Sequence, residues 1–370
     1  MFKHWQLYLL DVIKGKRKGL IPSALRGALH VPSLGFRLIV AGRNWAFDHH
    51  YLSRYFPPVP VVISIGNIVA GGTGKTPVTL MLAQEFYPEI SLAILSRGYR
   101  SPAEKLASPL MLSSGDGPLF PATYCGDEPY LLSQNLPKAL VMVGKDRHAA
   151  SDMAAQAGAQ IILLDDGMQH RRLARDFEIV VLDASDPFGQ GYYLPRGLLR
   201  EGTSSLARAD LLILNHVADT EKGAAVAKQL QRYTKAPIVT TKMVVSAIRD
   251  LDDQQIASIK GKPVGIFCGI AQPDNFRKAV EGLGANVVNH RYFPDHVGFG
   301  EQNLSRFVEE CQAHGAEMII CTEKDRVKFA NPLKTKLPII WLQMKLSIID
   351  GQEHWNKLIA NAKELVKRSC

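Results

Sequence analysis

Cysteine is scarce in this sequence, and no two cysteines stand close enough together to form a motif. Only five cysteines occur among 370 residues, and no pair has the C-x-x-C spacing. Structural zinc sites and disulfide frameworks both require clustered or regularly spaced cysteines. The scattered thiols therefore exclude a disulfide-stabilised scaffold and a cysteine-based zinc domain, and they favour a reducing, cytoplasmic compartment.

The sequence also lacks a long apolar run. A membrane-spanning helix needs about 20 mostly apolar residues, and the best stretch, within residues 34–47, is interrupted by Arg37. A secretory signal with a clean apolar core and a cleavage site is missing as well. We therefore expect a protein that does not cross the membrane.

Acidic residues are rare in residues 1–60, where nine basic side chains stand against two acidic ones. Aromatic and aliphatic residues alternate with these arginines and lysines, which is typical of a helix that lies in a membrane interface. Nucleic acid is the other anionic partner that such a segment can bind. We predict that residues 1–56 form a basic amphipathic segment that associates with membrane lipids, and that nucleic acid is not a partner.

Beyond residue 57, short runs of Val, Ile and Leu alternate with helix-like stretches. Continuous apolar runs indicate strands that are covered on both faces, as in a parallel α/β sheet with crossover helices. The polar stretch at residues 241–262 interrupts this pattern, which then resumes as a second, smaller α/β unit. The predicted strands are 61–65, 92–96, 139–143, 161–164, 179–182, 211–214, 237–240, 264–268, 286–290, 317–321 and 338–342, and helices are predicted at 274–283 and 303–314.

A glycine-rich turn joins the first of these strands to a helical pattern. Its glycines can bring backbone N–H groups onto phosphates, its lysine can reach the β- and γ-phosphates, and its threonine hydroxyl can bind Mg²⁺. Val69 stands where the strict pattern has glycine. The loop is closer to those of dimeric switch NTPases, although Ala70 replaces their signature lysine. We predict a P-loop whose nucleotide-binding residues are Gly71, Gly72, Thr73, Gly74, Lys75 and Thr76.

The acid that holds Mg²⁺ in such a site follows another apolar strand. Asp165 and Asp166 follow residues 161–164, and Asp183 follows a second run of the same form. A lone acid at a strand end is as often a helix cap. Because two acids are adjacent, we favour Asp165 and Asp166 and keep Asp183 as an alternative.

The chain is therefore predicted to be an α/β protein with a P-loop NTPase core and a parallel sheet. We place the core at residues 57–245 and the smaller α/β domain at residues 246–345. Residues 346–370 carry an amphipathic apolar stripe, which predicts a C-terminal helix that docks on the core.

Further short strings occur in a fixed order along the chain. With the P-loop, the ordered set closely resembles the tetraacyldisaccharide 4′-kinases (lipid A 4′-kinases), from about residue 35 to residue 330. No single string is diagnostic, but their order is specific. The strings are S-R-G-Y at 96–99, G-D-E-P at 126–129, V-G-K-D-R at 143–147, D-D-G-M-Q-H-R at 165–171, L-P-R-G-L-L-R-E at 194–201, P-D-H at 294–296 and T-E-K-D at 322–325.

This resemblance implies transfer of the γ-phosphate of ATP to the 4′-hydroxyl of tetraacyldisaccharide 1-phosphate, which gives lipid IVA in lipid A biosynthesis. It implies ATP and Mg²⁺ as cofactors and a glycolipid substrate. It also implies a peripheral enzyme on the cytoplasmic face of the inner membrane, with a P-loop core hinged to a smaller domain.

The resemblance also carries residue roles. It implies that Asp127 is the base that removes the proton of the acceptor hydroxyl and that His296 supports it, with Lys75 as the third catalytic residue. Arginine binds phosphate oxygens in a bidentate manner, so arginines near the site are candidates for contacts with the acceptor and for stabilising the transferred phosphoryl group. The expected metal-binding residues are Thr76, Asp165, Asp166 and Glu201, and the expected acceptor-binding residues are Tyr99, Arg147, Arg171 and Arg200.

Two other functions are compatible with parts of the sequence. A switch-type P-loop NTPase or metal-delivery chaperone would fit the loop, but the sequence lacks its signature lysine and any Cys/His cluster. A nucleic-acid-binding ATPase would fit the basic N-terminal segment. Neither explains the ordered strings.

Overall fold

The computed structural model describes residues 2–217, 219–270, 273–293, 301–327 and 335–369, which form two compact units. Both units are discontinuous in sequence, whereas the domains predicted above are continuous segments; those boundaries remain a prediction. The first unit comprises Met1–Ser96, Asp146–Lys242 and Ile348–Cys370, and the second comprises Arg97–Lys145 and Met243–Ser347.

The first unit contains a parallel sheet in the order β8-β7-β6-β1-β5-β2. Strand β1 lies between β5 and β6, and its Ile65 is in register with Asp165 at the end of β5. The carboxyl ends of these strands therefore meet where the P-loop begins. The strands of this unit are β1 (Val61–Gly66), β2 (Leu92–Ser96), β5 (Ile161–Asp165), β6 (Phe177–Asp183), β7 (Leu211–Asn215) and the start of β8 (Ile238–Asp250).

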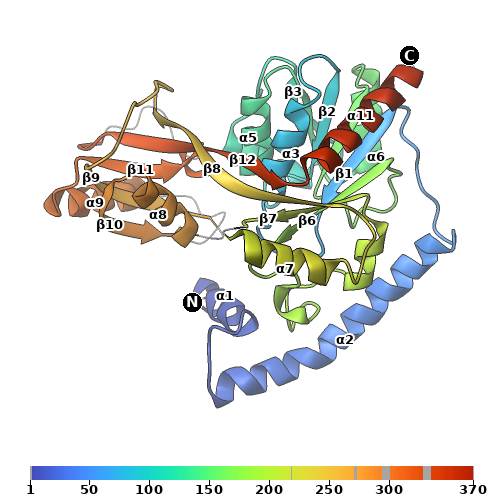
Figure 1. The fold of residues 1–370 in the computed structure, drawn as a ribbon, viewed down its shortest axis with the longest axis horizontal. Helices are drawn as coiled ribbons and strands as arrows, with labels where there is room; N and C mark the ends of the chain where they lie inside the picture. Colours follow the sequence, from blue (N-terminus) through green and yellow to red (C-terminus); the bar gives the residue numbers. More distant parts are fainter. Residues whose placement is uncertain (1, 218, 271–272, 294–300, 328–334, 370) are drawn as a thin grey trace. The chain divides into compact units, whose positions relative to one another are not determined.

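The helices of the first unit pack on this sheet. The C-terminal helix α11 lies beside β1 and the end of α3 (Figure 1), where Trp355 is fully buried and donates from Nε1 to Glu85 Oε1 at 2.8 Å. These helices are α3 (Lys75–Gln84), α6 (Arg147–Gln156), α7 (Thr220–Leu230) and α11 (Gln352–Ser369), with 3₁₀ turns η2 (Gly189–Gly191) and η3 (Thr203–Arg208).

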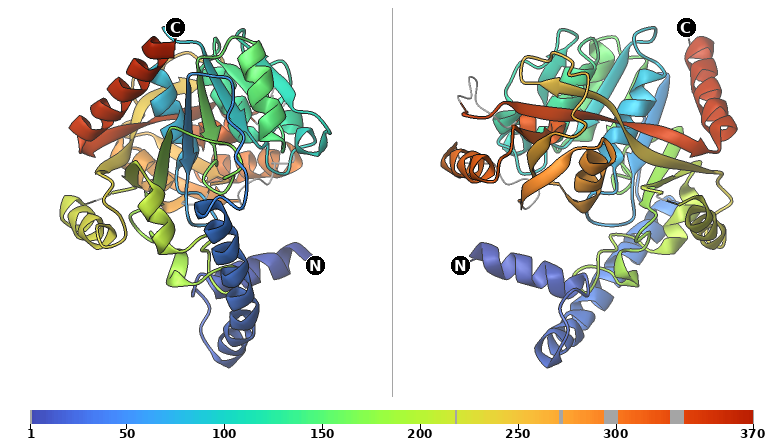
Figure 2. Two further views of the ribbon diagram at one scale, coloured as in Figure 1. Left: turned by 90° about the vertical axis from the view of Figure 1, so that its right-hand side faces the viewer. Right: turned by 60° about the vertical axis from the view of Figure 1, so that its left-hand side comes forward.

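Two further helices precede the sheet, α1 (Phe2–Ile13) and the 29-residue α2 (Leu20–Asp48). Helix α2 runs along the segment between β6 and β7 (Figure 2), where Ser33 Oγ donates to Tyr193 O at 2.8 Å. Within the described residues, no helix combines the length and the apolar character of a membrane span.

The second unit has strands in the order β10-β9-β11-β12-β8, and β9 pairs in parallel with both β10 and β11. It also holds the antiparallel pair β3 and β4. Its elements are η1 (Ala103–Lys105), β3 (Leu110–Ser114), α4 (Ala122–Cys125), α5 (Asp127–Asn135), β4 (Leu140–Val143), β9 (Pro263–Cys268), α8 (Pro273–Gly282), β10 (Asn286–Tyr292), α9 (Glu301–Ala313), β11 (Met318–Thr322), α10 (Glu323–Arg326) and most of β8 and β12 (Ile339–Asp350).

The predicted α/β class with a mostly parallel sheet is confirmed, and every predicted strand begins within a few residues of its expected start, although β8 and β12 continue eight or more residues beyond their expected ends. The expected polar interruption at 241–262 is wrong over its first part, because β8 continues to Asp250. Its outer half is only partly buried, so it carries polar residues that a search for apolar runs misses. Strand β3 was missed for a similar reason, since it is an edge strand with an exposed end.

Candidate active site

Two buried amides hold the P-loop at Thr73. Asn67, directly after β1, donates from Nδ2 to Thr73 Oγ1 at 2.9 Å, and Asn215 at the end of β7 donates to Thr73 O at 3.1 Å. Gly74 then adopts φ +84, and a Cβ there would lie 2.0 Å from Asn215 Nδ2. Only glycine fits this position, and α3 begins at the next residue, Lys75. The loop is thus preorganised to present its N–H groups and the helix N-terminus to phosphate.

Asp165 closes β5 and is buried beneath the loop. Its carboxylate accepts hydrogen bonds from Ser96 Oγ at 3.1 Å and from Thr79 Oγ1 of α3 at 3.5 Å. The hydroxyl of Thr79 lies one helical turn beyond the P-loop residue Thr76. Asp165 therefore joins the ends of β2 and β5 to the first helix after the loop.

Asp166 has a different environment from its neighbour. Its backbone has φ +56 and its side chain is 38% exposed. Lys75 Nζ lies 3.4 Å from its Oδ1, and Arg200 donates to both oxygens, at 2.9 and 2.7 Å. Burial would raise the pKa of Asp166, but Lys75 and Arg200 hold it well below its ordinary value. Two cations thus share one carboxylate at the mouth of the P-loop.

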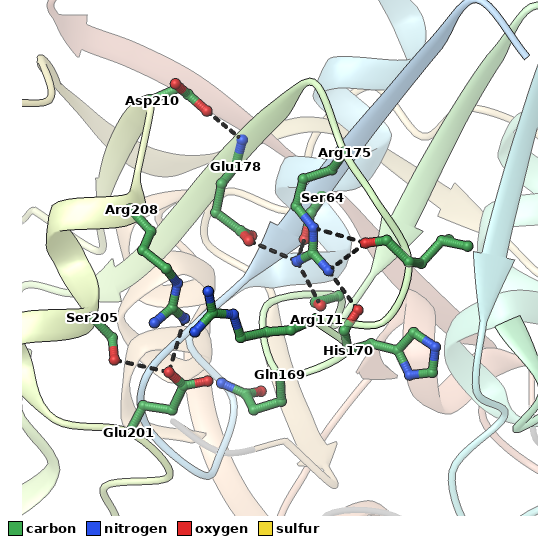
Figure 3. A network of polar contacts seen from close by, with 12 residues as sticks. Ser64, Gln169, His170, Arg171, Arg175, Glu178, Glu201, Ser205, Arg208 and Asp210 are labelled. Carbon is green, nitrogen blue, oxygen red and sulfur yellow. Dashed lines mark hydrogen bonds and ion pairs between the residues drawn. The ribbon is translucent and has the colours of Figure 1, made fainter. Parts of the chain in front are cut away.

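Arg175 donates hydrogen bonds to the loop that carries these acids (Figure 3). Its Nη1 donates to Gly167 O at 3.1 Å and to Glu178 Oε2 at 2.7 Å, and its Nη2 donates to His170 O. Burial raises the pKa of Glu178 despite the neighbouring Arg175. Arg175 therefore fixes the backbone directly after Asp166.

The alternative acid, Asp183, lies in another network. His216 Nδ1 lies 2.9 Å from its Oδ2, and Ser185 donates to its Oδ1 from both N and Oγ. Burial would raise the pKa of Asp183, but the hydrogen bonds from His216 and Ser185 hold it below its ordinary value. The geometry joins Asp166, rather than Asp183, to the P-loop lysine.

Glu201 is fully buried, and its hydrogen-bond partners differ from those of Asp165 and Asp166. Burial would raise the pKa of Glu201, but Arg208, with hydrogen bonds from Ser205 and Asn44, holds it below the ordinary value. Unlike the partly exposed Asp166, Glu201 is fully buried with both oxygens paired to arginines, which does not favour a bound metal ion, and its predicted metal role remains untested. Its partners are Arg43 Nη2 at 3.2 Å, Asn44 Nδ2 at 2.8 Å, Ser205 Oγ at 2.8 Å and Arg208 Nη2 at 2.8 Å.

Two predicted acceptor-binding arginines are buried against the protein itself. Arg147, at the start of α6, donates to Ser96 O at 2.8 Å. Arg171 donates to Asp48 Oδ1 at 2.6 Å and lies over the ring of Phe47, both in α2. Neither residue contacts the Lys75–Asp166 pair in the described structure, so their acceptor role stays a prediction.

The second unit brings several of the ordered strings together. Gly98 packs so closely on the residue before Gly126 that a Cβ at Gly98 would lie 2.8 Å from Cys125 O. Lys324 Nζ lies 2.7 Å from Glu128 Oε1, which ties the T-E-K-D string to the G-D-E-P string. Asp127 is the first residue of α5 in this unit.

Of the three remaining predicted residues, two lie within the described part of the chain. Tyr99 is exposed, with the guanidinium of Arg100 over its ring. Thr76 is half-buried in the first turn of α3. His296 lies outside the described residues.

Sequence reasoning missed residues that fasten the site, namely Asn67, Asn215, Ser96 and Arg175. A usable signal existed for three of them. Asn67, Ser96 and Asn215 each stand at or just past the carboxyl end of a continuous apolar run, where parallel strands place ligand-binding groups.

Comparison with known proteins identifies the family of this chain. The model of the family described as Tetraacyldisaccharide-1-P 4'-kinase (LpxK) matches residues 25–363. This chain belongs to the LpxK family. The resemblance drawn from the ordered strings is thus confirmed, and so are the kinase activity and the place in lipid A biosynthesis that it implied.

Individual relatives of the LpxK family agree with this assignment. The chain is 39% identical over 315 residues to a tetraacyldisaccharide 4'-kinase of Anaeromyxobacter sp. (strain K), covering 82% of each chain. It is 35% identical over 349 residues to the tetraacyldisaccharide 4'-kinase of Syntrophus aciditrophicus (strain SB), covering 90% of this chain and 92% of the relative. A crystal structure of LpxK from Aquifex aeolicus in complex with ATP matches with a TM-score of 0.72 and 28% identity, covering 91% and 99%.

Proposed function

We propose that this LpxK family member transfers the γ-phosphate of ATP to the 4′-hydroxyl of tetraacyldisaccharide 1-phosphate and so forms lipid IVA. The observation that carries the proposal is the cluster of Lys75, Asp166 and Arg200 at the P-loop. Two cations beside one carboxylate leave net positive charge where the phosphates of a nucleotide would bind. Phosphoryl transfer depends mainly on positioning and on such charge stabilisation.

Each residue of the cluster has a role in this proposal. Lys75 binds the β- and γ-phosphates, and the loop of residues 71–76 donates backbone N–H groups to them. Arg200 stabilises the negative charge that spreads over the transferred group, because its planar guanidinium matches phosphate oxygens.

The donor set also suits Mg²⁺. Mg²⁺ prefers hard oxygen ligands and keeps several waters, and the hydroxyl of Thr76 and the carboxylates of Asp165 and Asp166 are of this kind. Asp166 is 38% exposed and can reach such an ion. When bound, Mg²⁺ neutralises phosphate charge. Thr76, Asp165 and Asp166 are the residues that would hold it.

We further propose that Asp127 accepts the proton of the 4′-hydroxyl and that His296 orients it. A sugar hydroxyl is a weak nucleophile at neutral pH, so a carboxylate that removes its proton contributes about 10²- to 10⁴-fold. Asp127 lies in the first turn of α5, the helix tied to Lys324 through Glu128.

Association with the cytoplasmic face of the inner membrane is part of the same proposal. Helix α2 exposes Ile21, Val31, Leu38, Ile39 and Trp45, and basic side chains lie among them. A helix with exposed apolar residues and nearby arginines binds anionic lipid surfaces. We propose that this segment binds inner-membrane lipids and does not bind nucleic acid.

The decisive test is transfer of labelled γ-phosphate to tetraacyldisaccharide 1-phosphate in detergent micelles. We expect Lys75→Ala to lower kcat/KM by about 10²-fold or more, and Asp127→Asn to lower kcat by about 10²-fold with little change in KM for ATP. Lys357→Ala and Asp116→Asn remove exposed side chains of the same types and serve as matched controls. If the wild type hydrolyses ATP but labels no lipid, the acceptor is wrong and the switch-NTPase alternative gains support.

Membrane binding is tested separately by flotation with phosphatidylglycerol vesicles and with phosphatidylcholine vesicles. We expect binding to the anionic vesicles that is lost in Leu38→Asp, whereas Leu119→Asp, an equally polar change at another exposed leucine, keeps it. Binding of duplex DNA that competes with the vesicles would instead support a nucleic-acid partner.

A further inference from the structure

Two neighbouring residues, Arg200 and Glu201, hold two different parts of the first unit. The side chain of Arg200 pairs with Asp166 at the P-loop, while that of Glu201 is turned toward α2. Their backbone N–H groups both donate to Ile68 O, at 2.8 and 3.3 Å. The two side chains therefore share one short, fixed piece of backbone next to the P-loop.

The α2 side of this arrangement is a buried ion cluster. Arg43 and Asn44 of α2 contact different oxygens of Glu201, at 3.2 and 2.8 Å. Arg208 and Ser205 of η3 complete the cluster (Figure 3), and the side chain of Glu201 is fully buried. A buried carboxylate that loses one of its cations becomes costly, so the cluster strongly favours one position of α2.

The contacts of Glu201 argue against direct metal binding. Both of its oxygens already accept hydrogen bonds, and two of the donors are arginines. A metal ion would have to displace these cations from a fully buried group. The described contacts instead link Glu201 to the nucleotide side through the backbone that it shares with Arg200, which donates to Ile68 O next to the P-loop.

We propose that Glu201 is a positioning residue for the kinase reaction. It ties the segment that carries Arg200 to Arg43 and Asn44, so the placement of α2 on the first unit sets the position of the Arg200 guanidinium. Displacements of about 1 Å in a group that stabilises transferring charge lower turnover by up to about 10²-fold. The proposal rests on the function proposed above, and it links the helix that faces lipid to the nucleotide site.

The test compares Glu201→Gln and Arg43→Gln with Arg37→Gln, which removes an exposed arginine from the same helix. Steady-state kinetics would give kcat, KM for ATP and the Mg²⁺ concentration at half-maximal rate. We expect both cluster variants to lower kcat about tenfold, with Mg²⁺ half-saturation within about twofold of wild type. Arg37→Gln should leave KM for ATP and Mg²⁺ half-saturation at their wild-type values, and Arg43→Lys should recover part of the lost kcat. The double variant should be no slower than Glu201→Gln alone, because both changes break the same contact.

Two results would overturn the proposal. The first is a Glu201→Gln enzyme that needs about tenfold more Mg²⁺ for half-maximal rate while Arg43→Gln keeps the wild-type kcat. That result would show that Glu201 is a metal ligand. Variants that lose thermal stability but keep wild-type kcat per folded molecule would make the cluster purely structural. Because Glu201→Gln can impair folding, Arg43→Gln, at a partly exposed position, provides a second measurement of the effect on kcat. If the wild type transfers no phosphate, the proposed function fails instead, and the affinity of the same variants for a non-hydrolysable ATP analogue still reports on Arg200.

Discussion

Arg200 holds Asp166 with a bidentate pair, in which Nη1 donates to Oδ2 at 2.9 Å and Nη2 donates to Oδ1 at 2.7 Å. Arg200 Nη2 also contacts Asn67 Oδ1, the residue whose amide holds Thr73. The guanidinium thus connects the acid after β5 with the start of the P-loop. This relationship predicts that the planar shape of the side chain matters as well as its charge.

Arg200→Lys should therefore be far from conservative. Lysine offers a compact charge and cannot donate to both carboxylate oxygens in the fixed fork geometry of arginine. We expect kcat to fall by about 10- to 100-fold, while circular dichroism and the unfolding midpoint stay near wild type. Arg172→Lys, at an exposed arginine elsewhere in the first unit, controls for the substitution itself. An Arg200→Lys enzyme with wild-type kcat would show that charge alone is needed.

Gly74→Ala should disable the P-loop. Its φ of +84 is strained for alanine, and the added Cβ would lie 2.0 Å from Asn215 Nδ2. Gly158 has almost the same angle, φ +83, but an added Cβ there meets nothing within 4 Å. Gly158→Ala should therefore show only the cost of the left-handed backbone, about 1 to 2 kcal/mol.

The two glycine variants are compared by ATP affinity and by thermal unfolding. We expect Gly74→Ala to lose ATP binding at least tenfold, whereas Gly158→Ala binds ATP as the wild type does. Equal ATP affinity in the two variants would mean that the loop can shift away from Asn215, and that the observed hydrogen bond to Thr73 is not needed.

His170 should make the protein less stable in mild acid. Burial, with Arg147 and His148 nearby, lowers the pKa of His170 from 6.5 to about 4. Between these values the unfolded chain binds the proton and the folded chain does not, so the free energy of unfolding falls as the pH falls. The loss begins near pH 6.5 and is complete near pH 4.

Thermal unfolding of the wild type and of His170→Gln between pH 7.5 and pH 4 measures this effect. The wild type should lose more stability over this range than the variant, because glutamine has no proton to bind. His314→Gln replaces an exposed histidine and controls for the loss of an imidazole. Parallel curves for wild type and His170→Gln would contradict the assignment.

Trp355 should be essential for the stability of the first unit. Among the residues whose burial is described it is the largest fully buried side chain, and it joins α11 to Glu85 after α3 through a 2.8 Å hydrogen bond. We expect Trp355→Ala to lower the free energy of unfolding by about 3 to 5 kcal/mol. Trp355→Phe should cost less, since it keeps most of the buried ring and loses mainly the hydrogen bond.

Denaturant unfolding of both variants gives these values, and Trp355→Phe separates the packing from the hydrogen bond. A small effect of Trp355→Ala would mean that α11 contributes little to the fold of this unit.

The sequence by itself determined the P-loop, the strands on which it depends, and the family. These features are local, because a glycine-rich turn between an apolar run and a helix needs no distant residue to be recognised. The order of the short strings then identified the family without any structure. The acids at 165 and 166 were likewise readable as the end of a buried strand.

Only the tertiary structure decided which side chains meet. Arg200 and Asp166 are 34 residues apart, and Asn44 and Glu201 are 157 apart, so no spacing rule connects them. Arg200 and Glu201 lie at a bend of the chain. Arg200 contacts Asp166 at the P-loop while Glu201 contacts Asn44 of α2, a distinction that depends on what packs on each side of the chain.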